Sequence, residues 1–270
     1  MKSSTSRYVW RIICLCIIPA LLLAGWDSPS FGQDEGKDLA KKAQNPIANL
    51  ISVPFQNNTS FDIGSYDRTS NVLNIQPVVP FYDGRLVTRT ILPVVYQPDI
   101  FSESGGSTGL GDLNFTAFYT PESEKIMVGA GPILVFPTGG EERGAQKWSA
   151  GPSVVVISTP GPWVLGVLWN NIWSYAGDEE ARDVNQMLIQ YFINYNFPGF
   201  YITSAPIITA NWKAPEGQKW IVPFGIGIGK LMKLGKLPVN MTAQYYYNAV
   251  TPDYGPKWLL RLQAQLLFPR

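Results

Sequence analysis

Few residues of this chain are of the types that make and break bonds at neutral pH. Histidine is absent, which removes the usual general base and the commonest metal ligand. Cys14 and Cys16 lie together in the first apolar run and have no partner elsewhere, so we expect neither a disulfide nor a zinc site. Ser107 is central in a Gly-x-Ser-x-Gly sequence, but a nucleophile elbow needs a strand-turn-helix setting and a histidine. We therefore expect no catalysis.

Two polar sequences between the apolar segments resemble ligand-binding loops only superficially. The acids at 141–142 and 178–180 are candidates for binding calcium or cations that bridge lipopolysaccharide, but they lack the ligand spacing of an EF-hand. The run 105–109 has no lysine and no following helix, unlike a phosphate-binding loop. Solvated loops are the favoured interpretation, and we expect no metal and no cofactor.

Charged and amide side chains spaced through otherwise apolar segments are better placed to act on a solute. Arg89, Asp112 and Arg261 carry the charges. The amides expected to share their face are Gln76, Gln190, Gln244 and Gln263. Inside a water-filled lumen, a charge among amides selects solutes by sign and hydrogen bonding. The other interpretation is a salt-bridged network that fills a narrow barrel, with Arg89 and Asp112 paired on consecutive strands.

Both interpretations need elements that turn polar side chains inward, and the composition favours such elements. Hydrophobic residues make up 46% of the chain and charged residues only 15%, below the roughly 25% charge of a soluble domain. Uncharged polar residues interleaved with apolar ones suit a barrel with a lipid-facing outside and a wet inside. The net charge is +1, and the second half has no basic cluster that would follow a phosphate backbone. We expect no nucleic-acid partner.

From residue 51 onward the dominant pattern has a period of two, as in half-buried strands. In the segment 258–268, Leu260 and Leu266 share one face, whereas Arg261 and Gln265 share the other. The segment 239–248 repeats this alternation. An arginine that faces lipid near the midplane costs roughly 2–4 kcal/mol, so we expect the arginines of these strands to point inward.

Twelve segments are long enough to cross a bilayer as tilted strands. They cover residues 51–62, 71–81, 85–96, 110–119, 126–136, 149–159, 163–175, 185–196, 201–212, 221–233, 239–248 and 258–268. Short links follow the second, fourth, sixth, eighth and tenth segments, and longer or more polar links follow the third, fifth, seventh, ninth and eleventh. This alternation predicts an all-β fold: a closed, antiparallel, up-and-down transmembrane barrel with both termini in the periplasm.

Prolines inside the predicted strands conflict with a closed barrel, because proline has no N–H to donate to the ladder. The affected residues are Pro54, Pro77, Pro93, Pro206 and Pro223. We expect these prolines at bulges or near the rims. Gly225, Gly227 and Gly229 similarly predict a strongly bent or closely packed strand.

The N-terminus has the pattern of an export signal, with basic residues before an apolar run at 12–24. We expect a signal peptide over residues 1–32 with cleavage after Gly32; a retained anchor helix is the alternative, but the run is short and contains Pro19. Residues 33–46 then form a short periplasmic segment before a barrel over 47–270. The charged part of that segment is interpreted as a solvated leader or short helix, and the alternative is a plug that folds into the lumen.

Aromatic residues gather near the ends of the predicted strands, as in the interfacial girdles of membrane barrels. They are Trp148, Trp163, Trp169, Trp173, Trp212, Trp220, Tyr245, Tyr247 and Trp258. The alternatives are the core of a soluble sandwich and the lining of an apolar path for a substrate.

Several sequence blocks resemble an outer-membrane family named for the meta-pathway of phenol degradation, whose members are often labelled transporter or, misleadingly, neuromedin U. The blocks are residues 44–56, 151–152, 170–174, 203–208 and 267–269, and the similarity spans Gln44 to Arg270. The resemblance implies a barrel with a transport role and brings no catalytic residues. The chain departs from the usual C-terminal aromatic of barrel-assembly signals, because Pro269 and Arg270 follow Phe268.

The first functional hypothesis is an outer-membrane channel that passes small solutes, aromatic or apolar ones included, by passive diffusion. The alternative is a structural or adhesive barrel with a filled lumen. A barrel enzyme acting on lipid is a third hypothesis, disfavoured because no histidine activates a serine such as Ser107. The expected location is the outer membrane of a Gram-negative cell, with membrane lipids, lipopolysaccharide and the barrel-assembly machinery as partners.

Overall fold

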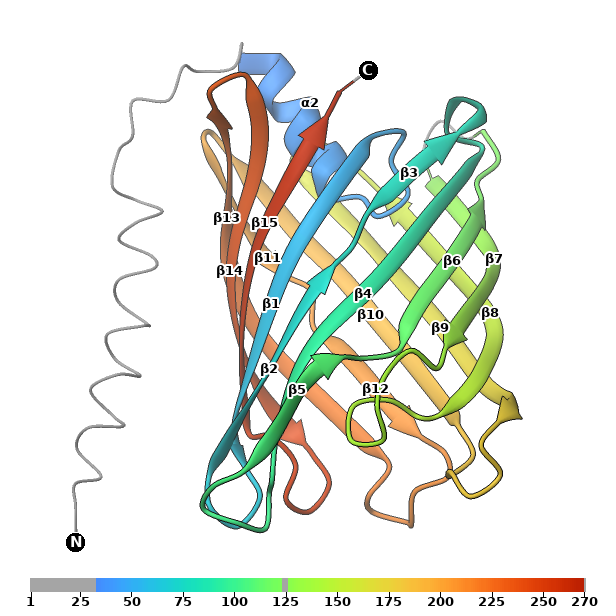
Figure 1. The fold of residues 1–270 in the computed structure, drawn as a ribbon. Helices are drawn as coiled ribbons and strands as arrows, with labels where there is room; N and C mark the ends of the chain where they lie inside the picture. The colour runs from blue at the N-terminus through green and yellow to red at the C-terminus, as the bar shows by residue number, and fades with distance from the viewer. Residues whose placement is uncertain (1–32, 123–125, 270) are drawn as a thin grey trace, which may run out of the picture.

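The computed structural model describes residues 33–122 and 126–269, which form a closed antiparallel β-barrel (Figure 1). The predicted signal peptide and its cleavage site after Gly32 lie outside the described residues. The wall begins at Ile51 and ends at Phe268, and these two residues are opposite each other where β1 pairs with β15. The sheet therefore joins its first strand to its last, as the alternation predicted.

Within the described residues the chain forms the helix α2 (Gln33–Ala43), the short 3-10 helix η1 (Tyr82–Gly84) and fifteen strand segments. The strand segments are β1 (Ile51–Ile63), β2 (Arg68–Ile75), β3 (Val78–Phe81), β4 (Leu86–Pro98), β5 (Gly106–Leu110), β6 (Leu113–Tyr119), β7 (Ile126–Phe136), β8 (Lys147–Ser158), β9 (Trp163–Gly177), β10 (Asn185–Phe197), β11 (Phe200–Ser204), β12 (Ile207–Asn211), β13 (Trp220–Leu234), β14 (Leu237–Val250) and β15 (Trp258–Phe268). Among the helices described, none is long and apolar enough to cross a membrane.

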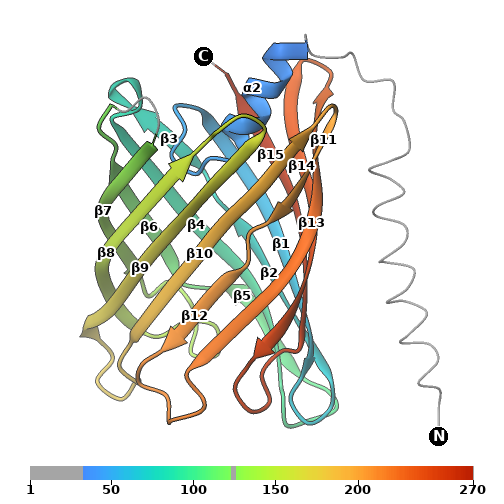
Figure 2. The ribbon, with the colours of Figure 1, turned by 180° about the vertical axis from the view of Figure 1, so that it is seen from behind.

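Three of the twelve predicted strands are interrupted, which accounts for the fifteen segments. The pairs β2 and β3, β5 and β6, and β11 and β12 each continue one strand of the wall after a short break. Every strand pairs antiparallel with its neighbours around the ring (Figure 2). The closed, twelve-stranded, up-and-down barrel is therefore confirmed.

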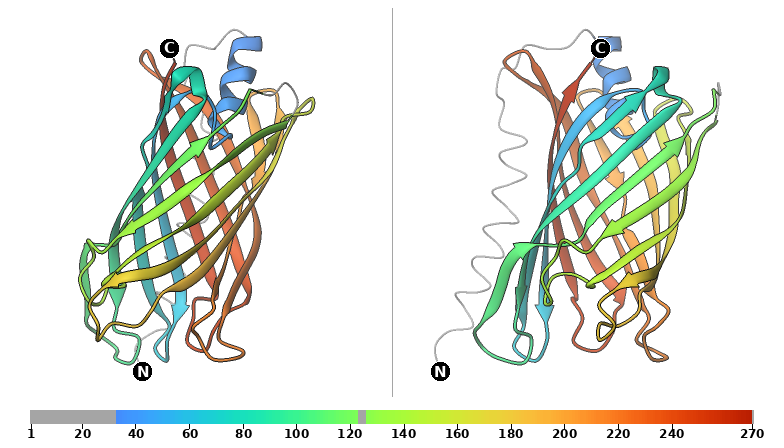
Figure 3. Two further views of the ribbon diagram at one scale, coloured as in Figure 1. Left: turned by 90° about the vertical axis from the view of Figure 1, so that its right-hand side faces the viewer. Right: turned by 45° about the vertical axis from the view of Figure 1, so that its right-hand side comes forward.

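The two ends of the barrel differ in their connections (Figure 3). One end carries the short links, such as residues 198–199 and 235–236, together with α2 and the end of β15; we call it the short-turn end. The other end carries the longer links, such as 137–146 and 212–219, and we call it the long-loop end. The predicted alternation of short and long connections matches this division from β2 onward, whereas the link between β1 and β2 at the long-loop end, residues 64–67, is short.

The five prolines that conflicted with a closed barrel coincide with interruptions of the wall. Pro77 lies between β2 and β3, Pro206 lies between β11 and β12, and Pro223 adjoins a register shift in the pairing of β13 with β14. Pro54 and Pro93 stay within strands, but each lies beside a break in the neighbouring strand. The positions that lack an N–H group therefore lie where the hydrogen-bond ladder between strands is already interrupted. These five prolines are thus compatible with a closed barrel.

The outer surface of the wall is apolar and its rims are aromatic. Val128, Val167, Ile193, Phe224 and Ile226 are exposed large hydrophobic residues of the strands. At the short-turn end, Trp163, Tyr195, Phe197 and Phe200 form a continuous run of ring contacts. At the long-loop end, Trp212 packs against Trp220, and Trp258 packs against Tyr245 and Tyr247. Trp169 differs from the expected girdle because it lies mid-strand, between Val154 and Ile189.

The glycines of β13 make room for large side chains inside the barrel. A Cβ at Gly229 would lie 2.1 Å from Cζ of Tyr201, and one at Gly227 would lie 2.6 Å from the side chain of Gln244. Both neighbours are buried, and the Tyr201 hydroxyl donates to Oδ1 of Asn240 at 2.9 Å. The closely packed strand predicted from the glycines is present.

Replacing Gly229 with alanine should destabilise the barrel by about 1–3 kcal/mol, because the new methyl group overlaps the ring of Tyr201. The midpoint of urea unfolding in lipid vesicles measures the effect. In a double-mutant cycle with Tyr201→Ser, which removes the ring, Gly229→Ala should cost much less than in the wild type. An equal cost in both backgrounds would show that the ring does not set the requirement for glycine.

Candidate functional site

The lumen contains two chambers that meet at four side chains. The loop-side chamber has a volume of about 450 Å³ and reaches residues of the long-loop end, such as Lys219 and Pro252. The helix-side chamber has a volume of about 120 Å³ and lies against residues 42–50. Both chambers are lined by Gln56, Gln76, Arg89 and Gln190, which we call the constriction.

Three members of the constriction form a hydrogen-bonded chain that runs from β1 through the break between β2 and β3 to Arg89 in β4. Gln76, in the break between β2 and β3, donates from Nε2 to Oε1 of Gln56 at 2.8 Å. Its own Oε1 accepts from Nη2 of Arg89 at 2.6 Å. Each amide is fixed by its neighbour, so the guanidinium of Arg89 is held in place. Its Nε and Nη1 donate to none of the residues that the structure describes.

Arg261 and the break between β11 and β12 form another part of the lumen wall. The side chain of Arg261 is buried and donates from Nη1 to the carbonyl oxygen of Ala205 at 2.8 Å and from Nε to Oδ1 of Asn58 at 2.9 Å. Gln190 donates to the same Ala205 carbonyl at 3.1 Å, and the Ala205 N–H donates to the hydroxyl of Tyr246 at 3.2 Å. The backbone groups left unpaired by the break are thus satisfied from inside the barrel.

The chambers carry positive charge without a compensating acid. Arg89 lines both chambers, Lys219 lines the loop-side chamber, and Arg261 and Lys42 line the helix-side chamber. No aspartate or glutamate is among the described residues that line either chamber. A low-dielectric wall around charges of one sign raises the local concentration of ions of the opposite sign.

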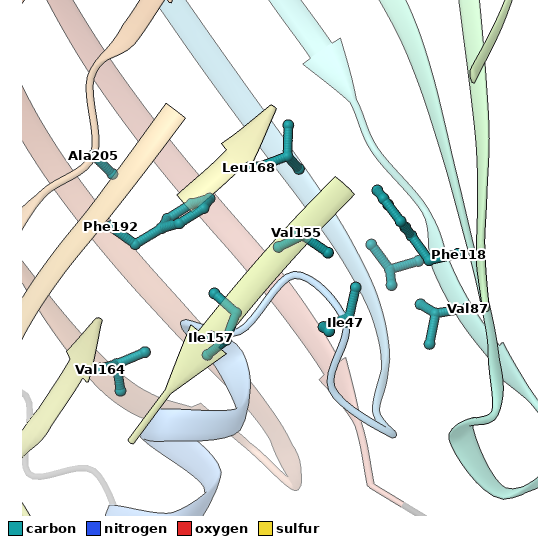
Figure 4. Packing of buried hydrophobic residues seen from close by; sticks show 10 residues of the cluster. Ile47, Val87, Phe118, Val155, Ile157, Val164, Leu168, Phe192 and Ala205 are labelled. Atoms are coloured by element: carbon teal, nitrogen blue, oxygen red, sulfur yellow. The ribbon is translucent and has the colours of Figure 1, made fainter. Parts of the chain in front are cut away.

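The segment that follows α2 enters the barrel and closes its short-turn end. Ile47 is buried among inward-facing residues of the wall, including Val87, Phe118 and Val155 (Figure 4). Gln44 and Asn196 exchange amide hydrogen bonds at 2.7 and 3.3 Å, which ties the segment to β10. The short-helix interpretation of the charged segment holds for α2. The alternative placed a plug in that same charged segment, whereas the residues that enter the barrel are the uncharged ones that follow it, 44–50.

A second apolar contact fixes α2 against the opposite side of the rim. Leu39 and Ala43 of the helix and Leu50 of the inserted segment pack with Leu267 of β15, and Leu231 of β13 lies against them. Burial of aliphatic side chains contributes roughly 25 cal/mol per Å² of apolar surface removed from water. The helix and the insertion are therefore held by the hydrophobic effect as well as by hydrogen bonds.

The inward face of the wall is not polar throughout, contrary to the strict alternation expected from the last two strands. Near the short-turn end, Val87, Phe118, Val155, Ile157 and Val164 are fully buried and surround Ile47. The reason is physical: these positions contact protein instead of water, so apolar side chains are favoured there. The inward face is polar beside β14 and β15 and apolar around Ile47.

Two features considered in the sequence do not form sites in the structure. Ser107 lies within β5, opposite Gln97 of β4, and β6 follows without a helix in between. Among the acids at 178–180, Oδ1 of Asp178 accepts from the N–H of Glu180 at 2.9 Å, and the nearby Asp183 is paired with Lys213 at 3.3 Å and with Lys147 at 3.9 Å. In the described part of the chain, no group of three or more histidine, cysteine, aspartate or glutamate side chains is arranged to hold a metal ion.

Comparison with known proteins places this barrel in a family. The sequence pattern of the family described as "Putative MetA-pathway of phenol degradation" matches residues 41–258, well over half of the chain. The chain belongs to that family. The matched region includes the inserted segment, the constriction and most of the wall.

Two solved structures share the fold of this family member. An outer membrane channel from Pseudomonas putida F1 is 21% identical, with a TM-score of 0.59, and the match covers 81% of this chain and 94% of that one. The NanC porin is 10% identical, with a TM-score of 0.54, and the match covers 82% of this chain and 100% of that one. No curated protein matches the sequence significantly.

Six of the seven polar residues singled out in the sequence of this family member line its chambers. They are Gln76, Arg89, Gln190, Gln244, Arg261 and Gln263. Their role in selectivity stays a prediction. The seventh, Asp112, does not line either chamber. Gln56 was missed, although it shares the inward alternation of Ser52 in β1.

The predicted pair between Arg89 and Asp112 is wrong. Asp112 lies between β5 and β6, where its Oδ1 accepts from the N–H of Gly139 at 3.0 Å and its Oδ2 accepts from the N–H of Ala145 at 2.7 Å. Arg89 instead donates to Gln76. The backbone of the link at 137–146 offers N–H donors close to the carboxylate, so Asp112 organises a loop. Within residues 33–122 and 126–269, Arg89 has no acidic partner.

Asp112→Ala should loosen this loop, because two backbone N–H groups lose a charged acceptor, at a cost of about 1–3 kcal/mol. We expect proteases to cleave between residues 137 and 146 faster in the variant than in the wild type. The matched control is Glu141→Ala, an exposed acid of the same loop. Equal cleavage rates in both variants would contradict the role given to Asp112.

Proposed function

We propose that this family member is an outer-membrane channel that passes small solutes through the barrel lumen. The observation that carries the proposal is the pair of lumen chambers that meet at a polar constriction. The loop-side chamber, about 450 Å³ in volume, lies within the roughly 300–1,000 Å³ of small-molecule sites. The apolar outer wall and aromatic rims suit a lipid bilayer, and the two similar solved structures are an outer membrane channel and a porin.

The proposed orientation has the short-turn end in the periplasm and the long loops outside the cell, as in other barrels of this architecture. Membrane lipids then contact the apolar wall, and lipopolysaccharide contacts the basic residues near the long loops. The barrel-assembly machinery is the expected partner for insertion. No cofactor or catalytic step belongs to this function.

Passage requires the inserted segment to move. Ile47 and the apolar residues around it occupy the short-turn end of the lumen, so a solute that has crossed the constriction meets protein. This filling is also the observation that favours the alternative function, a structural or adhesive barrel that passes no solute. The two functions make opposite predictions for a variant in which Ile47 no longer fits its apolar surroundings.

Liposome swelling with solutes of graded size and polarity tests the proposal. In the Ile47→Asp variant a charge is placed among apolar side chains, which disfavours the inserted position, so arabinose and glucose should enter several-fold faster than through the wild type. The control is Ile126→Ser on the outer face near the same end, which should leave the rate unchanged. If neither the wild type nor Ile47→Asp passes arabinose, the barrel is structural.

A further inference from the structure

We propose that Arg89, assisted by the positive charge of Arg261 on the same helix-side chamber, forms a lumen binding site for small carboxylate anions that carry an apolar body, such as aromatic carboxylates. This inference rests on the proposed function, because the solute must enter the lumen. It adds the chemical class of the solute and the residues that recognise it.

The first argument is the charge of the two arginines. Arg261 is buried and Arg89 is partly buried inside the lumen. An arginine removed from water is usually paired with an acid, because an uncompensated charge in a low-dielectric interior is costly. Here the hydrogen-bond acceptors are neutral: Gln76 Oε1 for Arg89, and Asn58 Oδ1 and the Ala205 carbonyl for Arg261. Since no described residue lining the chambers is acidic, an anionic ligand is the group that would balance the charge.

The second argument is the number of free donors. A guanidinium has five N–H groups in a planar fork that matches a carboxylate. Arg89 uses only Nη2 for hydrogen bonds to described residues, and Arg261 uses Nε and Nη1. Nε and Nη1 of Arg89 therefore remain for a ligand at the constriction, where the side chain borders both chambers. Nη2 also keeps one N–H that Gln76 does not use, and Nη2 together with either Nε or Nη1 binds a carboxylate in a bidentate manner.

The third argument is the apolar wall beside Arg89. The loop-side chamber combines the guanidinium with inward-facing aliphatic and aromatic residues, namely Ile91, Phe118, Ile133, Leu168, Leu188 and Ile207. A small inorganic anion would leave this surface exposed to water, and a neutral apolar molecule would leave the arginine unpaired. A ligand with a carboxylate at one end and an apolar body at the other satisfies both.

The site is tested by calorimetric titration of the purified full chain in detergent with benzoate, benzamide and benzylamine. These probes share the ring but are an anion, a neutral amide and a cation. We expect benzoate to bind at least tenfold more tightly than benzamide and benzylamine not to bind measurably. Acetate, which lacks the ring, should bind at least tenfold more weakly than benzoate.

Arg89→Gln should weaken benzoate binding at least tenfold and leave benzamide unchanged, because the glutamine keeps a polar side chain at the constriction but removes the charge. The matched control is Arg85→Gln, an exposed arginine outside the lumen that pairs with Glu122; it should bind benzoate as the wild type does. Equal binding of benzoate and benzamide by the wild type would overturn the inference without any variant. So would a folded Arg89→Gln variant that binds benzoate normally.

Liposome uptake of the same probes separates this inference from the proposed function. If benzoate binds preferentially but no solute enters through Ile47→Asp, the channel function fails and the binding site stands. If all three probes enter through Ile47→Asp at the same rate and bind equally, the channel stands and the anion site is overturned. Benzoate entry that is fastest, and slowed at least fivefold by Arg89→Gln, supports both.

Discussion

The pairing of β1 with β15 is the constraint on which the remaining structure depends. A sheet that faces lipid has no water to satisfy an open edge, so every strand must find a neighbour on each side. Closure is achieved in register from Ile51 opposite Phe268 to Phe61 opposite Trp258. It also explains where the five prolines at 54, 77, 93, 206 and 223 are tolerated: each lies at or beside an interruption, so the ladder loses few additional hydrogen bonds. The breaks in turn bring Gln76 and Ala205 to the inside of the barrel, where the arginines bind them.

Closing twelve strands creates an interior that the wall side chains do not fill by themselves, and the chain fills it unequally. On one side Ile47 and its apolar neighbours occupy the short-turn end. On the other side a series of amides and hydroxyls, from Tyr201 through Asn240 and Gln265 to Ser52, satisfies itself by hydrogen bonds. A solute in the lumen therefore meets a polar strip and an apolar strip at the same depth. This arrangement distinguishes the lumen from a uniformly wet pore.

The wall was predictable from the sequence because its pattern is local. Alternation over ten or so residues fixes which side of a strand faces lipid, so Arg261 and Gln190 were placed in the lumen correctly. Two features were not predictable in this way. The position of Ile47 depends on Val155 and Phe118, far along the chain, and nothing in residues 44–50 distinguishes an insertion from the start of a strand. The partner of Asp112 depends on the path of a long loop, and the sequence does not indicate which backbone N–H groups of that loop come close to the carboxylate. Gln56 follows the same alternation as its neighbours in β1, so its inward orientation could have been predicted by the same reasoning.

The choice of amides beside the arginines has a further physical consequence. A glutamate in place of Gln76 would bond the guanidinium of Arg89 more strongly, since charge-assisted hydrogen bonds are about twice as strong as neutral ones. It would also cancel the charge and remove the field that attracts an anion. Gln76 has a donor and an acceptor, so it fixes Arg89 through Oε1 while its Nε2 is anchored on Gln56. The guanidinium of Arg89 is thus held in a fixed geometry and keeps its net positive charge. A group that binds a mobile anion requires both properties, whereas a purely structural ion pair does not require an uncompensated charge.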